Sequence, residues 1–158
     1  YKIGDKKMKY KDIVDTHTIR SDLMRYELHR VWVVDATLKD DMRHAYGRRT
    51  FYLDEDSWMI VGEDAYDTRG NLWRVGVHGV RQNYDALVPW YGVQIWHDLN
   101  NGAYLADGLD NEIKAPIVFG KKAKWADFQP ERLNRVAVTG DSDDGSASVK
   151  VSSIDRAR

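Results

Sequence analysis

The chain has 158 residues and no cysteine, and its 24 Lys and Arg nearly balance its 25 Asp and Glu. This length predicts one domain that buries roughly two thirds of its unfolded surface in a single core, so no disulfide is needed for stability. The formal net charge of -1 excludes a broad basic surface for nucleic acid, and no apolar run reaches the roughly 18 residues of a membrane-spanning helix.

The first segment, residues 1–24, is polar, irregular and rich in lysine, so we expect a solvated basic arm. The chain starts at Tyr1, without an initiator methionine or the apolar stretch of a secretory signal, and we expect it to be a piece of a longer precursor. Composition leaves the compartment open, because many periplasmic and cytosolic proteins alike lack cysteine.

Apolar and polar residues alternate from Tyr26 to Leu38, which predicts a long β-strand with one buried face. Strands are also expected over residues 46–53, 58–66 and 72–80, because turns rich in Asp, Gly and Asn separate them. This order of strands and tight turns predicts an antiparallel meander.

Register follows from requiring apolar residues to meet across each hairpin, because a slip of one residue turns every side chain to the opposite face. We expect Trp32 opposite Phe51 and Leu53 opposite Trp58. One face of the sheet is then aromatic and aliphatic, and the other is largely charged. The apolar face is predicted to comprise Trp32, Phe51, Leu53, Trp58, Ile60, Val75 and Val77.

The next apolar segment begins at Val88 and is broken by Pro89, which we place outside the middle of a sheet because proline lacks a ladder donor. Two further strands, residues 93–97 and 103–109, flank an Asn-Gly turn at Asn101. These strands bring the predicted sheet to six.

The sheet domain is expected to cover residues 25–135 and to end in a short helix that begins near Pro130, a residue favoured at the first helical position. Residues 136–158 form an acidic, Ser-rich tail, with a candidate last strand near Ser148. No internal repeat is found in the sequence.

No motif of a catalytic or metal site stands out. The histidines lack the spacing of a zinc hydrolase helix, and a pair of His29 with His78 has no third ligand marked by the sequence. The acidic run 141–145 lacks the glutamate of a calcium-binding EF-hand loop. We therefore expect no enzyme activity, no catalytic residues, no metal and no cofactor.

Aromatic residues are the unusual feature, with 6 Trp and 9 Tyr. A sheet with so little helix has little to cover an apolar face, and an uncovered apolar concavity is typical of a small-molecule or lipid site. Trp90, Tyr91 and Trp96 could instead be platforms for a carbohydrate. A third interpretation is a structural domain with every tryptophan in its core.

Several segments together resemble a Gram-negative family of unknown function, whose members are described as outer-membrane lipoprotein-sorting-like proteins. The resemblance spans about Tyr10 to Arg135 and corresponds to the C-terminal part of much longer precursors. It implies a mainly β fold similar to the Lol carriers: a strongly curved antiparallel meander, an unclosed half-barrel that holds acyl chains beneath one or two short helices. The segments that carry it are 25–34, 49–58, 66–67, 70–74, 88–91 and 127–130.

We therefore expect a non-enzymatic binding or carrier module for a hydrophobic or lipidated ligand, periplasmic or associated with the outer membrane. Its partners would be that ligand and the N-terminal part of its precursor or an envelope assembly. An open edge strand, Tyr26–Leu38 or the one near Ser148, is expected to pair with a second copy or another segment. The expected ligand-binding residues are Tyr26, Trp32, Phe51, Trp58, Ile60, Trp73, Val75, Trp90, Tyr91 and Trp96.

Overall fold

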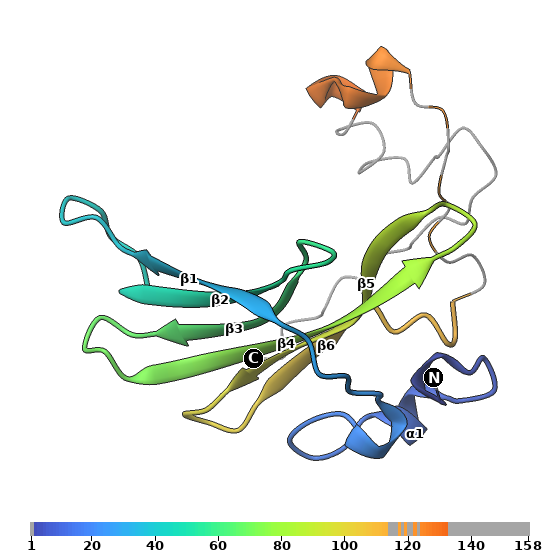
Figure 1. Cartoon of the computed structure of the whole chain (residues 1–158), viewed down its shortest axis with the longest axis horizontal. Coiled ribbons are helices and arrows are strands. Elements are labelled where there is room, and N and C mark those ends of the chain that lie inside the picture. The colour runs from blue at the N-terminus through green and yellow to red at the C-terminus, as the bar shows by residue number, and fades with distance from the viewer. Residues whose placement is uncertain (1, 114–116, 118, 120–121, 123, 133–158) are drawn as a thin grey trace, which may run out of the picture. The chain divides into compact units, whose positions relative to one another are not determined.

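The computed structural model describes residues 2–113, 117, 119, 122 and 124–132, and the chain divides into two units, residues 1–112 and 113–158. The first unit contains a six-stranded antiparallel sheet whose strands follow one another in sequence order (Figure 1). The sheet does not close on itself, which confirms the predicted unclosed, mainly β meander. The strands are β1 (Val31–Thr37), β2 (Arg48–Asp54), β3 (Ile60–Tyr66), β4 (Leu72–Asn83), β5 (Val88–Asp98) and β6 (Tyr104–Asp107).

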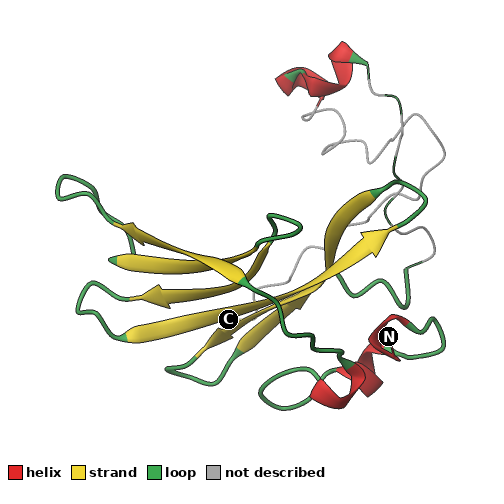
Figure 2. Cartoon of the chain, viewed as in Figure 1, coloured by secondary structure: helices red, strands yellow, loops and turns green. Residues whose placement is uncertain are grey.

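Helices are short throughout the described part of the chain (Figure 2). Before β1 lie η1 (Lys2–Gly4), α1 (Tyr10–Ile13) and η2 (Ser21–Leu23). In the second unit, η3 (Trp125–Phe128) is followed by helical residues 130–132, where the sequence predicts a helix. The candidate strand near Ser148 lies outside the described residues. Among the described helices, none has the length and apolar character needed to cross a membrane.

The core of the first unit lies between the sheet and the segment that precedes it. Ile13, Ile19 and Leu23 of this segment pack with Val93 and Ile95 of β5. Ile13 and Ile19 are 0% and 1% exposed. The segment is therefore not the solvated arm predicted from its lysines. Its apolar residues follow no regular period, but short helical turns direct them onto the sheet.

Pairing between strands defines two faces of the sheet. We call one the core face, because it carries Ile95, and the other the aromatic face, because it carries Trp96. A paired row crosses the core face through Val33, Tyr52, Gly62, Val77, Ile95 and Ala106. The neighbouring row crosses the aromatic face through Val34, Phe51, Glu63, Gly76, Trp96 and Leu105.

A β-bulge in β3 changes the predicted register. Leu53 pairs with Ile60 and Tyr52 pairs with Gly62, so Val61 is an extra residue between them. An extra residue in one strand reverses the alternation of side chains beyond it. Sequence alternation alone does not locate such a residue.

The bulge alters which side chains share a face. Phe51 pairs with Glu63, so a charged side chain lies on the face predicted to be apolar. Val75 and Val77 lie on the core face instead of beside Phe51. Trp32 stays on the side of Phe51, because the first hairpin is shifted by two residues and the alternation is kept.

Several strands begin at residues other than those predicted. β1 begins at Val31 rather than Tyr26, and every residue of β1 after Val31 is exposed, so the predicted buried face is wrong. β3 begins at Ile60, because Trp58 lies in the preceding turn with a φ of 58°. β5 begins at Val88 and includes Pro89, although the strand was predicted to begin at residue 93. Pro89 is tolerated because, among the described residues, β6 pairs with residues 94–97 of β5 and Pro89 has a neighbouring strand, β4, on one side.

Candidate functional site

Apolar side chains cross the aromatic face at one end of β1, β2 and β3. Trp32 pairs with Leu53, which pairs with Ile60, and Val34 pairs with Phe51 in the next row of the same face. We call these five residues the apolar strip. Trp32 is 54% exposed and Val34 is 44% exposed. The strip is thus a contiguous apolar surface that water reaches.

Charged side chains that pair with one another lie beside the strip on the aromatic face. Arg49 Nη2 lies 2.6 Å from Glu63 Oε2, and Trp96 Nε1–H donates to Glu63 Oε1 at 2.9 Å. The Arg49 guanidinium lies 4.7 Å from the centre of the Phe51 ring. Gly76 leaves room for this group, because a Cβ there would lie 2.6 Å from Glu63 Cγ. Apolar side chains and paired charged side chains therefore lie next to one another on the aromatic face.

A second ionic group lies further along the same face. Asp98 Oδ2 accepts hydrogen bonds from Arg74 Nε at 3.2 Å and from Trp73 Nε1 at 3.0 Å, and Arg74 Nη1 donates to the Tyr46 hydroxyl at 2.8 Å. Trp73 reaches this side because it is the extra residue of a bulge in β4. A pocket of about 410 Å³ lies over the group. Its lining includes Tyr46, Glu63, Ala65, Arg74, Trp96 and Asp98.

His78 extends the aromatic face along β4. Its ring centre lies 5.2 Å from that of Trp96 and 5.8 Å from that of Tyr91. The side chain is buried, with 8% of the residue exposed, and its Nδ1 has no hydrogen-bond partner among the described residues. Burial lowers the pKa of His78, so the ring is neutral at pH 7.

The structure brings together several of the predicted ligand-binding residues and separates others. Those on the aromatic face are Trp32, Phe51, Ile60, Trp73, Tyr91 and Trp96. Val75 lies on the core face. Trp58 and Tyr26 are each 67% exposed and lie outside the strands. Trp90 is 43% exposed and lies in β5 beyond the reach of β6. The role of all these residues in ligand binding stays a prediction.

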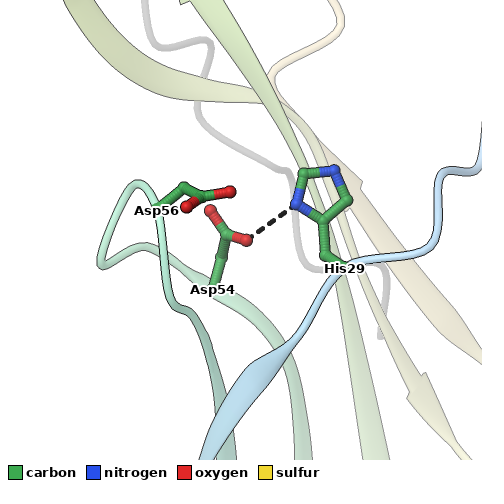
Figure 3. A group of neighbouring side chains, drawn as sticks. All are labelled: His29, Asp54 and Asp56. Atoms are coloured by element: carbon green, nitrogen blue, oxygen red, sulfur yellow. Dashed lines mark hydrogen bonds and ion pairs between the residues drawn. The ribbon is translucent and has the colours of Figure 1, made fainter.

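A separate group of potential metal ligands lies where the chain enters β1 (Figure 3). One ligand atom from each of His29, Asp54 and Asp56 lies within 4.8 Å of the others. The pairing of β1 with β2 continues past Val31, because the Glu55 amide donates to the carbonyl of the residue before Val31 at 3.1 Å. This register sets His29 opposite Asp56.

Hydrogen bonds fix the carboxylate of Asp54 within this group. Asp54 is 5% exposed, and its Oδ2 accepts from the Ser57 amide at 2.9 Å and the Ser57 hydroxyl at 2.5 Å. These bonds to Ser57 hold the pKa of Asp54 below its usual range. The His29 Nδ1–H donates to Asp54 Oδ1 at 2.8 Å, and this bond, with a weaker one to Glu27, raises the pKa of His29.

From the sequence, His78 was the residue considered as a metal-binding partner of His29. The neighbours that His29 has in the structure, Asp54 and Asp56, were not predicted. By the strand register, Asp54 lies on the core face side of the sheet, whereas His78 lies on the aromatic face. The available signal is the spacing of Asp54 and Asp56, because residues two apart at a strand end share a side. This spacing points to His29 only once the register of the first hairpin is known.

Together these features define an unclosed, mainly β sheet domain with an exposed apolar strip. The chain belongs to the family of proteins of unknown function called DUF1329, whose profile matches residues 1–134, and the family resemblance is confirmed. An uncharacterized protein of Pseudomonas aeruginosa is 49% identical over 138 residues, which cover 87% of this chain. The chain spans about 30% of the length of that relative.

Among solved structures, the chain is similar to a domain from Vibrio parahaemolyticus that is provisionally described as an outer membrane lipoprotein-sorting protein. The two share 16% sequence identity and a TM-score of 0.49. The match covers 66% of this chain and 42% of the Vibrio chain.

Proposed function

We propose that this protein is a non-enzymatic module that binds or carries a hydrophobic or lipidated ligand on the aromatic face. The observation that supports this most strongly is the apolar strip, in which Trp32 is 54% exposed and Val34 is 44% exposed. Contiguous exposed apolar surface is typical of binding sites. An acyl chain that buried about 200 Å² there would gain about 5 kcal/mol before the cost of association.

The ionic groups beside the strip suit a ligand with one polar end. Arg49 and Glu63 lie next to Phe51 on the same face, and Glu63 also accepts from Trp96. The apolar chain of an amphiphile would lie along the strip, and its polar end would contact these paired charges. Specificity for chain length would be loose, because apolar contacts are not directional.

We place the protein in the periplasm, associated with the outer membrane or free of it. This location rests on the family resemblance described above, together with membership of that family. The proposed partners are the hydrophobic ligand and an envelope assembly or the further segments that its longer relative contains. Nucleic acid is not proposed, because the formal net charge is -1.

A carbohydrate-binding module is the second candidate, and the pocket of about 410 Å³ favours it. Trp96 lines this pocket together with Arg74 and Asp98. An aromatic ring beside charged hydrogen-bonding groups can stack on a sugar ring and bind its hydroxyls. This candidate uses a different part of the aromatic face from the apolar strip.

Titration with the fluorescent fatty acid cis-parinaric acid tests the proposal. Trp32→Glu puts a charge into the strip and should weaken binding at least tenfold, because an acyl chain would desolvate the carboxylate. Val33→Glu is the matched control: Val33 is 59% exposed on the same strand but faces the other side. Its affinity should stay within about twofold of the wild type.

The other interpretations make different predictions in the same assay. Binding of soluble glucans that Trp96→Ala abolishes, without binding of the fatty acid, would replace the proposal with the carbohydrate module. Binding of neither probe would contradict both and leave a structural domain of an envelope assembly. Equal weakening by Trp32→Glu and Val33→Glu would show that the aromatic face is not the site.

A further inference from the structure

We propose that His29, Asp54 and Asp56 form a binding site for a divalent transition-metal ion of the zinc class. They offer one imidazole nitrogen and two carboxylate oxygens, all within 4.8 Å of one another. Figure 3 shows the three side chains converging on one space between the turn after β2 and the chain that enters β1. The site is independent of the ligand surface proposed above.

The distances suit a small cation. Zinc binds nitrogen and oxygen ligands at about 2.0–2.2 Å in a tetrahedron, which sets neighbouring ligand atoms about 3.4 Å apart. His29 Nδ1 and Asp54 Oδ1 are 2.8 Å apart, held by a single proton. A metal ion would replace that proton, which leaves to solvent, and a small outward movement of the two groups would complete the geometry.

Asp54 and His29 each have a hydrogen-bond partner of the kind that orients metal ligands in metal sites. Ser57 occupies only Oδ2 of Asp54, which leaves Oδ1 directed at His29. On the far side of the imidazole, His29 Nε2 lies 3.4 Å from Glu27 Oε2. A metal-bound histidine usually donates its second ring N–H to a carboxylate, and Glu27 is placed to accept it.

Asp56 supplies an observation that these hydrogen bonds do not explain. Its carboxylate lies within 4.8 Å of the Asp54 carboxylate, yet it has no hydrogen bond or ion pair with any described residue. The two carboxylates repel each other at this distance, and water screens the exposed Asp56. A divalent ion would remove the repulsion and give Asp56 a partner.

The donor set selects the class of metal. Calcium and magnesium prefer oxygen ligands, whereas an imidazole nitrogen favours zinc and its neighbours in the first transition row. The three residues leave at least one coordination position for water or an anionic group. The sequence predicted no metal, because the third ligand is set by the hairpin register and the turn.

The experiment measures zinc binding by the full chain after dialysis against a chelator, using calorimetry and the visible absorption of cobalt as a substitute ion. We expect one equivalent of zinc per chain. Asp56→Asn and His29→Gln should each weaken binding at least tenfold. Asp41→Asn, an exposed acid in another turn, is the matched control and should bind within twofold of the wild type. Asp54 is left unchanged because it is buried.

Failure of the wild-type chain to bind stoichiometric zinc would overturn the proposal, as would wild-type affinity in both ligand variants. Tighter binding of calcium than of zinc would overturn the assignment to a transition metal. The fatty-acid titration reports on the other face, so loss of zinc binding with unchanged fatty-acid affinity would contradict only the metal site.

Discussion

His78 shows how a single side chain can make the stability of this fold depend on pH. Its ring is packed between Tyr91 and Trp96, and its Nδ1 has no hydrogen-bond partner among the described residues. Burial lowers the pKa of His78, and the nearby Glu63 carboxylate opposes this effect only in part. The folded state therefore binds a proton at His78 less readily than the unfolded chain does.

The unfolded chain takes up this proton near the ordinary histidine pKa of about 6.5, so the folded state loses stability as the pH falls below that value. The loss approaches about 1.4 kcal/mol per pH unit until the pH reaches the lowered pKa of the folded state. His78→Phe keeps the aromatic packing and removes the titrating group. Urea unfolding between pH 8 and pH 5 should show the wild type losing stability relative to this variant.

A constant stability difference between the two proteins over this range would show that folding does not lower the pKa of His78. The difference between the proteins is the relevant quantity, because His29 has a raised pKa and shifts the wild-type curve in the opposite direction. Both proteins retain His29, so its effect cancels in the comparison.

Among the elements, the segment before β1 contributes more to the fold than its composition suggests. Ile13 and Ile19 are the largest fully buried side chains among the described residues. Beyond this packing, the hydroxyl of Tyr104 on β6 donates to the Asp15 carbonyl at 2.8 Å, and Asn111 Nδ2 donates to the Ile3 carbonyl at 2.7 Å. The segment is therefore tied to β6 near its middle and, near its start, to the turn that follows β6.

Ile19→Ala should lower the free energy of unfolding by about 2–4 kcal/mol, because it removes buried methyl groups and leaves a cavity. Val14→Ala is the matched control, since Val14 pairs with Ile19 in an isolated bridge but is 43% exposed. Its effect should stay below about 1 kcal/mol. Chemical denaturation would measure both, and equal small effects would mean that the segment is not part of the folding unit.

Elements with strong local signals could be predicted from the sequence, and features set by contacts between elements could not. The hairpin at Asp67 was predicted from the Asp, Gly and Asn residues of its turn. In the structure, the Asp67 side chain accepts from two turn amides and Gly70 has a φ of 86°. The burial of Ile13 was missed, because no periodicity marks it. The neighbours of His29 and the face of Val75 depend on hairpin register and on the bulge at Val61, which only tertiary pairing reveals.

For the whole molecule, β1 is one edge of the sheet, and its outer side has no strand among the described residues. The Glu55 amide donates to the Arg30 carbonyl and the Leu38 amide donates to the Gly47 carbonyl, so even-numbered residues direct their backbone groups toward β2. The odd-numbered residues direct theirs outward. These are Val31, Val33, Asp35 and Thr37.

This edge carries neither proline nor lysine, and all of β1 after Val31 is exposed. We therefore expect the chain to self-associate through β1 at about tens of micromolar, because unpaired strand edges template further pairing. Val33→Pro removes an outward amide without disturbing the ladder to β2, and it should restore the monomer. Val33→Thr keeps the amide and should associate like the wild type.

Sedimentation velocity measures this association directly. A monomeric wild-type chain at the same concentration, with the outward amides of β1 protected from hydrogen exchange, would show that another part of the chain already covers the edge. Association that survives Val33→Pro would place the contact elsewhere.

Backbone amide NMR during titration with decanoate tests whether a hydrophobic ligand binds the apolar strip. We expect saturable shifts at the residues of the strip, on one side of three neighbouring strands: Trp32, Val34, Phe51, Leu53 and Ile60. Shifts should be small at Ile13 and Ile19 in the core. Absence of saturable shifts, or shifts confined to residues away from the strip, would contradict binding at this surface.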